Sequence, residues 1–260
     1  MRILFIGDIV GKVGRICVKN ILPKILSNFK TSFVIANGEN AAGGFGINEK
    51  VAKELFSFGI DLITSGNHIW DKKEAVNYLK KEDRILRPLN YPPGVPGYGS
   101  IVLGSTGKQR LGIINLSGRV FMPLLDCPFR TVDSEILKLK EETNAVIIDF
   151  HAEATSEKIA FGRYVDGRVS AVIGTHTHVQ TADETILGKG TAYITDVGMT
   201  GPSDSVIGVE TDIIIEKFLT QMPKRFNTAR GNGIFSGVIV DIDEKNGKAT
   251  AIQRLQLTYP

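Results

Sequence analysis

The sequence predicts an α/β protein in which strands, loops and helices alternate along the chain. Three observations support this class: short apolar runs, a small or polar break after each run, and an amphipathic stretch beyond the break. Where apolar runs follow one another closely, at residues 100–116 and 237–257, the short spacing indicates antiparallel hairpins. A mixed sheet or a pair of stacked sheets fits this pattern better than a purely parallel sheet. We expect residues 1–260 to form a single domain.

The first part of the chain predicts strands and helices in successive units of about 30 residues. Strands are expected at residues 2–7, 32–36 and 61–65, and helices at residues 18–29, 49–58 and 73–81. Beyond Arg84, four prolines between residues 88 and 96 exclude a regular helix and predict a long surface loop. Further strands are expected at residues 100–104, 110–116, 145–150, 170–174, 191–195, 237–242 and 249–257.

The composition limits the partners of the protein. The chain has 31 Lys and Arg against 28 Asp and Glu, and no long run of like charge indicates a nucleic-acid or membrane surface. Cys17 and Cys127 are too few for a disulfide framework or a cysteine-rich zinc site, so two reduced thiols are expected. No signal peptide or membrane span is evident. We therefore expect a cytoplasmic protein. The charge balance itself names no partner, and a homo-oligomer is an open option.

Polar side chains that can bind metal follow five of the apolar runs. These residues are Asp8, Glu39, Asn40, Asn67, His68, His151, His176 and His178, and they include all four histidines of the chain. A lone histidine in a loop is more often a surface group, and a lone Asp or Asn is more often a turn or helix cap. Ligands of open α/β sheets bind beyond the carboxyl ends of the strands. Five coincidences of this kind therefore favour one shared site.

His176 and His178 lie two residues apart, and on an extended backbone their side chains would face the same way. This spacing leaves open whether they bind one metal ion or two. Without His68 the set still holds seven groups, which exceed the three protein ligands of a catalytic zinc and favour two metal ions. Carboxylate, amide and imidazole ligands without thiolate suit iron, manganese or zinc. Two ions about 3.5–4 Å apart activate a shared water for displacement at phosphorus, which predicts phosphoester hydrolysis.

The segments GNH (66–68) and GTHTH (174–178), preceded by an Asp at the end of the first strand, resemble the signature of the calcineurin-like metallophosphoesterases. More closely, six segments resemble the YmdB-like family of 2′,3′-cyclic-nucleotide 2′-phosphodiesterases: residues 7–15, 38–47, 65–71, 150–158, 166–183 and 192–202. Asp8-Ile9-Val10 and Gly38-Glu39-Asn40 depart from the broad superfamily in a way that matches this narrower family. The resemblance implies two stacked mixed β-sheets flanked by helices. It also implies a small-molecule substrate, either a 2′,3′-cyclic nucleotide or another phosphodiester.

The resemblance also implies roles for individual residues. Asp8, Glu39, Asn40 and His178 would hold the first metal, and Glu39, Asn67, His151 and His176 would hold the second, with Glu39 as the bridge. A hydroxide between the metals would attack phosphorus, while His68 would protonate the leaving ribose oxygen as general acid. The alternative for His68 is a histidine that only hydrogen-bonds near the site. The resemblance indicates iron, with manganese and then zinc as alternatives.

Two other functions compete with this hypothesis. A TIM-barrel amidohydrolase also uses a His-x-His pair, but there the pair lies on the first strand, whereas here that strand ends in Asp8. A regulatory or scaffolding protein with a structural metal site is the second alternative. Arg119, Arg163, Arg168 and Arg230 stay unassigned, because a single Arg more often forms a surface ion pair. Packing is favoured over base stacking for Trp70.

Overall fold

The computed structural model describes residues 1–104 and 109–260. Strands of the first sheet are β1 (Arg2–Ile6), β2 (Asp8–Ile9), β3 (Phe33–Asn37), β4 (Leu62–Thr64), β11 (Met199–Pro202), β12 (Gly233–Ile242) and β13 (Ala249–Tyr259). Strands of the second are β5 (Ser100–Leu103), β6 (Leu111–Ser117), β7 (Val146–His151), β8 (Ala171–Thr175), β9 (Thr185–Ile186) and β10 (Ala192–Ile194). The helices are α1 (Gly11–Asn28), α2 (Glu49–Ser57), α3 (Ala75–Leu79), α4 (Pro128–Lys140), α5 (Thr155–Tyr164) and α6 (Thr211–Thr220).

Both sheets are mixed. The strand order is β2-β11-β12-β1-β3-β4 in the first, with β13 paired to β12, and β5-β6-β7-β8-β10-β9 in the second. The predicted hairpins are confirmed, because β5 pairs antiparallel with β6 and β12 pairs antiparallel with β13. The central strands β1, β3 and β4 run parallel, as do β6, β7, β8 and β10. Their carboxyl ends therefore gather at one side of each sheet.

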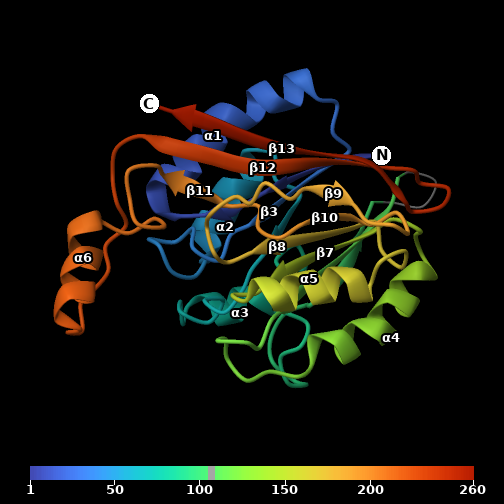
Figure 1. The fold of residues 1–260 in the computed structure, drawn as a ribbon, viewed down its shortest axis with the longest axis horizontal. Coiled ribbons are helices and arrows are strands. Elements are labelled where there is room, and N and C mark those ends of the chain that lie inside the picture. Colours follow the sequence, from blue (N-terminus) through green and yellow to red (C-terminus); the bar gives the residue numbers. More distant parts are fainter. Residues whose placement is uncertain (105–108) are drawn as a thin grey trace.

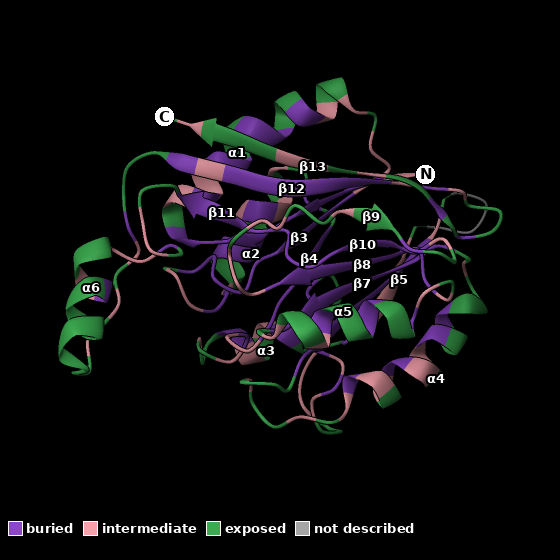
Figure 2. Cartoon of the chain, viewed as in Figure 1, coloured by how far each residue is buried: buried purple, intermediate pink, exposed green. Residues whose placement is uncertain are grey.

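The two sheets stack face to face, with helices on their outer sides (Figure 1). Residues of β1 alternate between two cores: Ile3 and Phe5 pack between the sheets, whereas Leu4 and Ile6 pack toward α1 and α2. The second sheet packs its other face on α4 and α5 in the same way. Strands buried on both faces read as continuous apolar runs, and Figure 2 shows them buried through the centre. The predicted helix–sheet–sheet–helix class is confirmed.

Two sequence expectations need correction. The first helix begins at Gly11 rather than at residue 18. Gly14 does not interrupt it, because a Cβ there would lie 2.3 Å from the Thr200 carbonyl oxygen, so the glycine permits close packing of α1 on β11. The expected surface loop beyond Arg84 is partly buried, since Ile85 and Leu86 form bridges to neighbouring segments and are fully covered.

Helix α6 projects from the body of the molecule (Figure 1). Ile214 is its buried residue, while Phe218 and Leu219 are largely exposed. None of the helices in the described ranges has the length and apolar character that a bilayer-spanning segment requires.

Candidate metal centre

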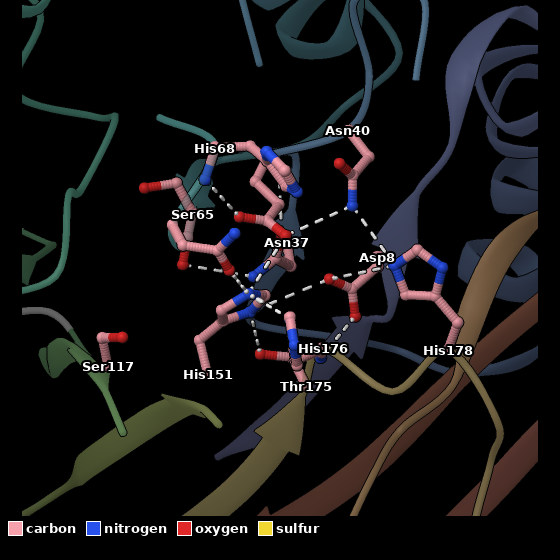
Figure 3. A network of polar contacts seen from close by, with 12 residues as sticks. Asp8, Asn37, Asn40, Ser65, His68, Ser117, His151, Thr175, His176 and His178 are labelled. Carbon is pink, nitrogen blue, oxygen red and sulfur yellow. Dashed lines mark hydrogen bonds and ion pairs between the residues drawn. The ribbon is translucent and has the colours of Figure 1, made fainter. Parts of the chain in front are cut away.

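Both sheets contribute side chains to one site at their carboxyl ends. Asp8 is the first residue of β2, and the other groups from the first sheet follow β3 and β4. His151 ends β7, and His176 and His178 follow β8. Figure 3 shows these side chains directed toward one another. The structure thus brings together all eight residues selected from the sequence: Asp8, Glu39, Asn40, Asn67, His68, His151, His176 and His178.

The densest contacts surround Nε2 of His151. This nitrogen lies 3.0 Å from Glu39 Oε1, 3.1 Å from Asn67 Oδ1 and 3.0 Å from His176 Nδ1. Ligand atoms of Glu39, His151 and His176 all lie within 4.8 Å of one another. Most of these atoms carry lone pairs. A single proton can be shared by only two of them, whereas a metal ion can bind all of them at once. The donor set therefore fits a metal ion at this point.

A second group of donors lies around Asp8. Its Oδ1 atom is buried without a hydrogen-bond partner among the described residues, and it lies 3.9 Å from His178 Nε2. Asn40 Nδ2 lies 3.2 Å from both His178 Nε2 and Glu39 Oε1. An unpaired buried carboxylate oxygen is costly, so this atom also fits a metal ligand. For Asn40 to bind metal through oxygen, its amide would have to be turned over.

Each imidazole at the centre has an outer partner that orients the ring. His176 Nε2 lies 3.0 Å from Glu153 Oε2, and His178 Nδ1 lies 2.8 Å from the Ile207 carbonyl oxygen. Both partners only accept hydrogen bonds, so these nitrogens carry the protons and the opposite ring nitrogens offer lone pairs to the site. His151 Nδ1 faces Thr175 Oγ1 at 2.9 Å, and Thr175 donates its own proton to Asp149. Such outer contacts are typical of metal-binding histidines.

Burial and neighbouring charges shift the pKa values of the site. Burial raises the pKa of Glu39, but the opposing His151 outweighs it and lowers that pKa to about 2. Burial likewise opposes protonation of His151, but Glu39 and Asp8 raise its pKa to about 9. Burial and then the charge of His151 lower the pKa of His176 to about 3, and burial raises that of Asp8. The centre therefore carries buried negative charge that His151 balances in part.

The segment with His176 and His178 is not extended, contrary to the geometry assumed from the sequence. Both residues have positive φ, 101° and 67°, a region that costs a non-glycine residue about 1–3 kcal/mol. Their side chains reach one site because the backbone turns here, and not because side chains two residues apart on a strand point the same way. The turn is fixed by Asp196, whose Oδ2 accepts hydrogen bonds from Thr177 N at 3.0 Å and from Thr177 Oγ1 at 2.7 Å. Asp196 in turn forms a fully buried ion pair with Lys158, 2.7 Å long.

Gly66 allows the two sheets to meet at the site. A Cβ at this position would lie 2.2 Å from the His151 ring and 2.4 Å from Glu39 Oε2. No other residue type fits without moving these two side chains. The close approach of His151 and Glu39 therefore explains why glycine occupies the first position of the GNH segment.

His68 stands beside the centre with a different surrounding. Its Nδ1 atom lies 2.8 Å from Asp71 Oδ2, and its ring meets Phe45 edge to face at 5.1 Å. Its backbone N–H donates to Glu39 Oε2 at 3.1 Å. Asp71 therefore orients the ring through Nδ1, and Nε2 takes no part in the contact with Asp71.

A cavity of about 250 Å³ opens over these groups. Its polar side is formed by site residues such as Asn40, His68 and His178. Its other side is apolar and includes Phe45, Ile207, Val209 and Phe226. The arrangement can receive a ligand that has one charged end and one flat apolar end.

Comparison with known proteins identifies the family. A family model described as YmdB-like protein matches residues 4–255. The chain belongs to the YmdB-like family. It is 52% identical over 255 residues to the 2′,3′-cyclic-nucleotide 2′-phosphodiesterase of Bacillus subtilis (strain 168), covering 98% of this chain and 96% of that protein.

Solved structures agree with this YmdB-like assignment. A hypothetical protein from Thermus thermophilus superposes with a TM-score of 0.93 at 44% identity, and each chain is covered completely. A novel phosphatase from Mycoplasma pneumoniae superposes with a TM-score of 0.93 at 36% identity, covering 100% of this chain and 94% of that one. The metallophosphoesterase fold implied by the sequence is confirmed, and the chain is a hydrolase of this phosphodiesterase and phosphatase family.

Sequence reasoning missed several residues of this YmdB-like site. These are the residues that orient others: Asp71, Glu153, Lys158, Thr175 and Asp196. Asp71 and Glu153 follow a site histidine by three and two residues, so local spacing could have suggested them. Lys158 and Asp196 are 38 residues apart and give no such signal. Trp70 packs edge to face on Tyr91 at 5.6 Å, as the packing interpretation expects.

Proposed function

We propose that the protein is a dinuclear-metal phosphodiesterase that opens 2′,3′-cyclic nucleotides by breaking the bond between phosphorus and the 2′ oxygen. The observation that carries this proposal is the convergence of seven residues with oxygen and nitrogen donors beside His68, under a cavity with an apolar wall. The name of the Bacillus subtilis relative supports this substrate class.

The residues divide into two neighbouring ligand sets. Asp8, Glu39, Asn40 and His178 would hold one metal ion, and Glu39, Asn67, His151 and His176 would hold the other. Glu39 suits the bridge, because its Oε1 lies near both Asn40 Nδ2 and His151 Nε2. The bound ions, iron or else manganese, would supply a water of lowered pKa and stabilise the charge on the phosphoryl oxygens.

His68 is the proposed general acid. Breaking the bond to the 2′ oxygen creates an alkoxide, which needs a proton as the bond breaks. His68 lies at the cavity wall and is held by Asp71 through Nδ1, so its Nε2 proton can be directed to that oxygen. Asp71 is acceptor-only when ionised, so it keeps a proton on His68 Nδ1 and sets the direction of Nε2.

The apolar wall accounts for recognition of a nucleotide. With the cyclic phosphate at the ligand groups, the nucleobase would lie against Phe45, Ile207 or Phe226. The cavity, of about 250 Å³, suits one nucleoside, and an apolar wall distinguishes weakly between bases.

The test is an assay of purified protein with 2′,3′-cyclic nucleotides and with an aryl phosphodiester, with bound metals measured in the same sample. We expect turnover of both, metal in the sample, and loss of turnover in Asn67→Ala and His178→Ala. Asn20→Ala, an exposed asparagine of α1, is the matched control and should keep full activity. Full activity of Asn67→Ala would contradict the proposal. Inactive protein after loading with iron and manganese would favour the structural-metal alternative.

A further inference from the structure

A second cavity, of about 810 Å³, lies beside the first. Phe226, Asn227 and Thr228 line both cavities. Gly44 lines the first and its neighbour Gly43 lines the second. This segment borders both cavities, so the two cavities adjoin along it.

The shared segment is well packed. A Cβ on Gly44 would lie 2.5 Å from Thr228 Cγ2, and one on Gly11 would lie 3.1 Å from the same atom. Thr228 is thus wedged between the start of α1 and the loop after β3. Phe226 is also covered by Lys217, whose Nζ lies 4.4 Å from the ring centre. The segment that both cavities share is consequently held firmly at Thr228.

The second cavity is basic. Lys12, Arg225 and Arg230 line it, and Glu210 is its one acidic residue among the described residues. Charges in the chain are nearly balanced, with 31 Lys and Arg against 28 Asp and Glu, so three cations against one acid are a local excess. None of the three cations takes part in an ion pair between described residues. Glu210 contacts Asn227 at 3.5 Å instead.

We propose that this cavity binds a second phosphate of the substrate, carried on the 5′ oxygen of the nucleotide whose cyclic phosphate lies at the metal centre. The inference rests on the proposed function and deepens it, because it names the substrate class. Two guanidinium groups and an ammonium group suit a phosphate, which Arg can bind through two parallel hydrogen bonds. That phosphate is either a terminal 5′-phosphate or the diester link to the preceding nucleotide of an RNA end.

The first experiment compares kcat/KM for three substrates. These are adenosine 2′,3′-cyclic phosphate, its 5′-phosphorylated form, and the dinucleotide ApA that ends in a 2′,3′-cyclic phosphate. We expect the second phosphate to raise kcat/KM about tenfold, and the gain to fall as ionic strength rises. A gain limited to the 5′-phosphorylated form identifies a monoester site, whereas a gain for the dinucleotide as well identifies an RNA-end site.

Variants connect the gain to the cavity. In the double variant Arg225→Ala, Arg230→Ala, the ratio of kcat/KM between the 5′-phosphorylated and unphosphorylated substrates should fall to about one. Lys24→Ala, an exposed lysine near the far end of α1, is the matched control and should keep the full ratio. An unchanged ratio in the double variant would overturn the proposal.

A second measurement does not depend on turnover. Adenosine 3′-phosphate and adenosine 3′,5′-bisphosphate differ only in the 5′-phosphate. The ratio of their dissociation constants therefore measures what that phosphate contributes to binding. We expect the bisphosphate to bind about tenfold more tightly to the wild type and equally to the double variant. Equal binding to the wild type refutes the second phosphate site even if cyclic nucleotides are hydrolysed. If cyclic nucleotides are not hydrolysed but the bisphosphate still binds tenfold more tightly, the proposed function is refuted and the phosphate site is not.

Discussion

The two halves of the metal centre differ in chemistry and in the way they are held. The first sheet supplies oxygen and amide groups from Asp8, Glu39, Asn40 and Asn67, and the second supplies the imidazoles of His151, His176 and His178. The oxygen half sits directly on the ends of parallel strands. The imidazole half includes two residues with left-handed backbone, which depend on Asp196 and Lys158 for their position. The first half therefore relies on the sheet itself, and the second relies on a buried ion pair outside the centre.

The largest expected effect comes from removing one group of the oxygen half. Asp8→Asn keeps the shape but removes a buried charge, and we expect kcat/KM to fall about 10³-fold or more together with bound metal. In metal-depleted protein the same variant should unfold less easily, because burial disfavours the carboxylate and its Oδ1 lacks a partner among the described residues. Activity, metal analysis and urea unfolding measure these effects. Asp204→Asn, on the surface, is the control, and equal metal content in both variants would refute the assignment.

The next effect tests the support of the imidazole half. Lys158→Met leaves the buried Asp196 carboxylate without its ion pair, which should lower the free energy of unfolding by about 3–5 kcal/mol and reduce bound metal. Lys138→Met removes an exposed lysine that pairs with Glu135 and should cost at most about 1 kcal/mol. Urea unfolding of the two variants gives the comparison. Equal losses would mean that the buried pair has no special role.

Asp71→Asn tests how His68 is oriented. We expect kcat for a cyclic nucleotide to fall about tenfold or more, because the ribose oxygen leaves poorly without a proton. An aryl phosphodiester has a better leaving group and should lose much less. Steady-state rates with both substrates measure the difference, and Asp83→Asn is the exposed control. Equal losses with both substrates would argue against a general acid.

The smallest effect is expected far from both halves, at the amino end of β1. The hydrogen bond from Arg2 lowers the pKa of Asp241, so the pair stabilises the fold above the ordinary pKa of an aspartate and stops doing so as pH falls through the lowered value. Asp241→Asn should cost at most about 1 kcal/mol at pH 7. The difference from wild type should shrink as pH falls through the lowered pKa, as measured by urea unfolding at pH 7 and at low pH. A difference that persists there would show that charge is not its source.

Most of the strands and the members of the site could be predicted from the sequence, for identifiable reasons. Strands buried on both faces, such as β1 and β7, leave continuous apolar runs, and their ends mark where Asp8 and His151 lie. The left-handed turn at His176 and His178 could not be predicted, because tertiary hydrogen bonds from Thr177 to Asp196 impose it on residues that do not favour it. The early start of α1 was hidden because Gly14 reads as a helix breaker until its contact with Thr200 is known. That the predicted ligands bind metal stays a prediction.

The pairing of β1 with β12 has a consequence for synthesis of the protein. β1 lies between β3 and β12 in the sheet, and residues 2–6 pair with residues 237–241. A ribosome that has made only the first half of the chain has not yet made residues 237–241, so the strand leading to Asp8 has one open edge until they are synthesised. We expect the strand leading to Asp8 to reach its final place late in folding, because this pairing joins residues far apart in the sequence.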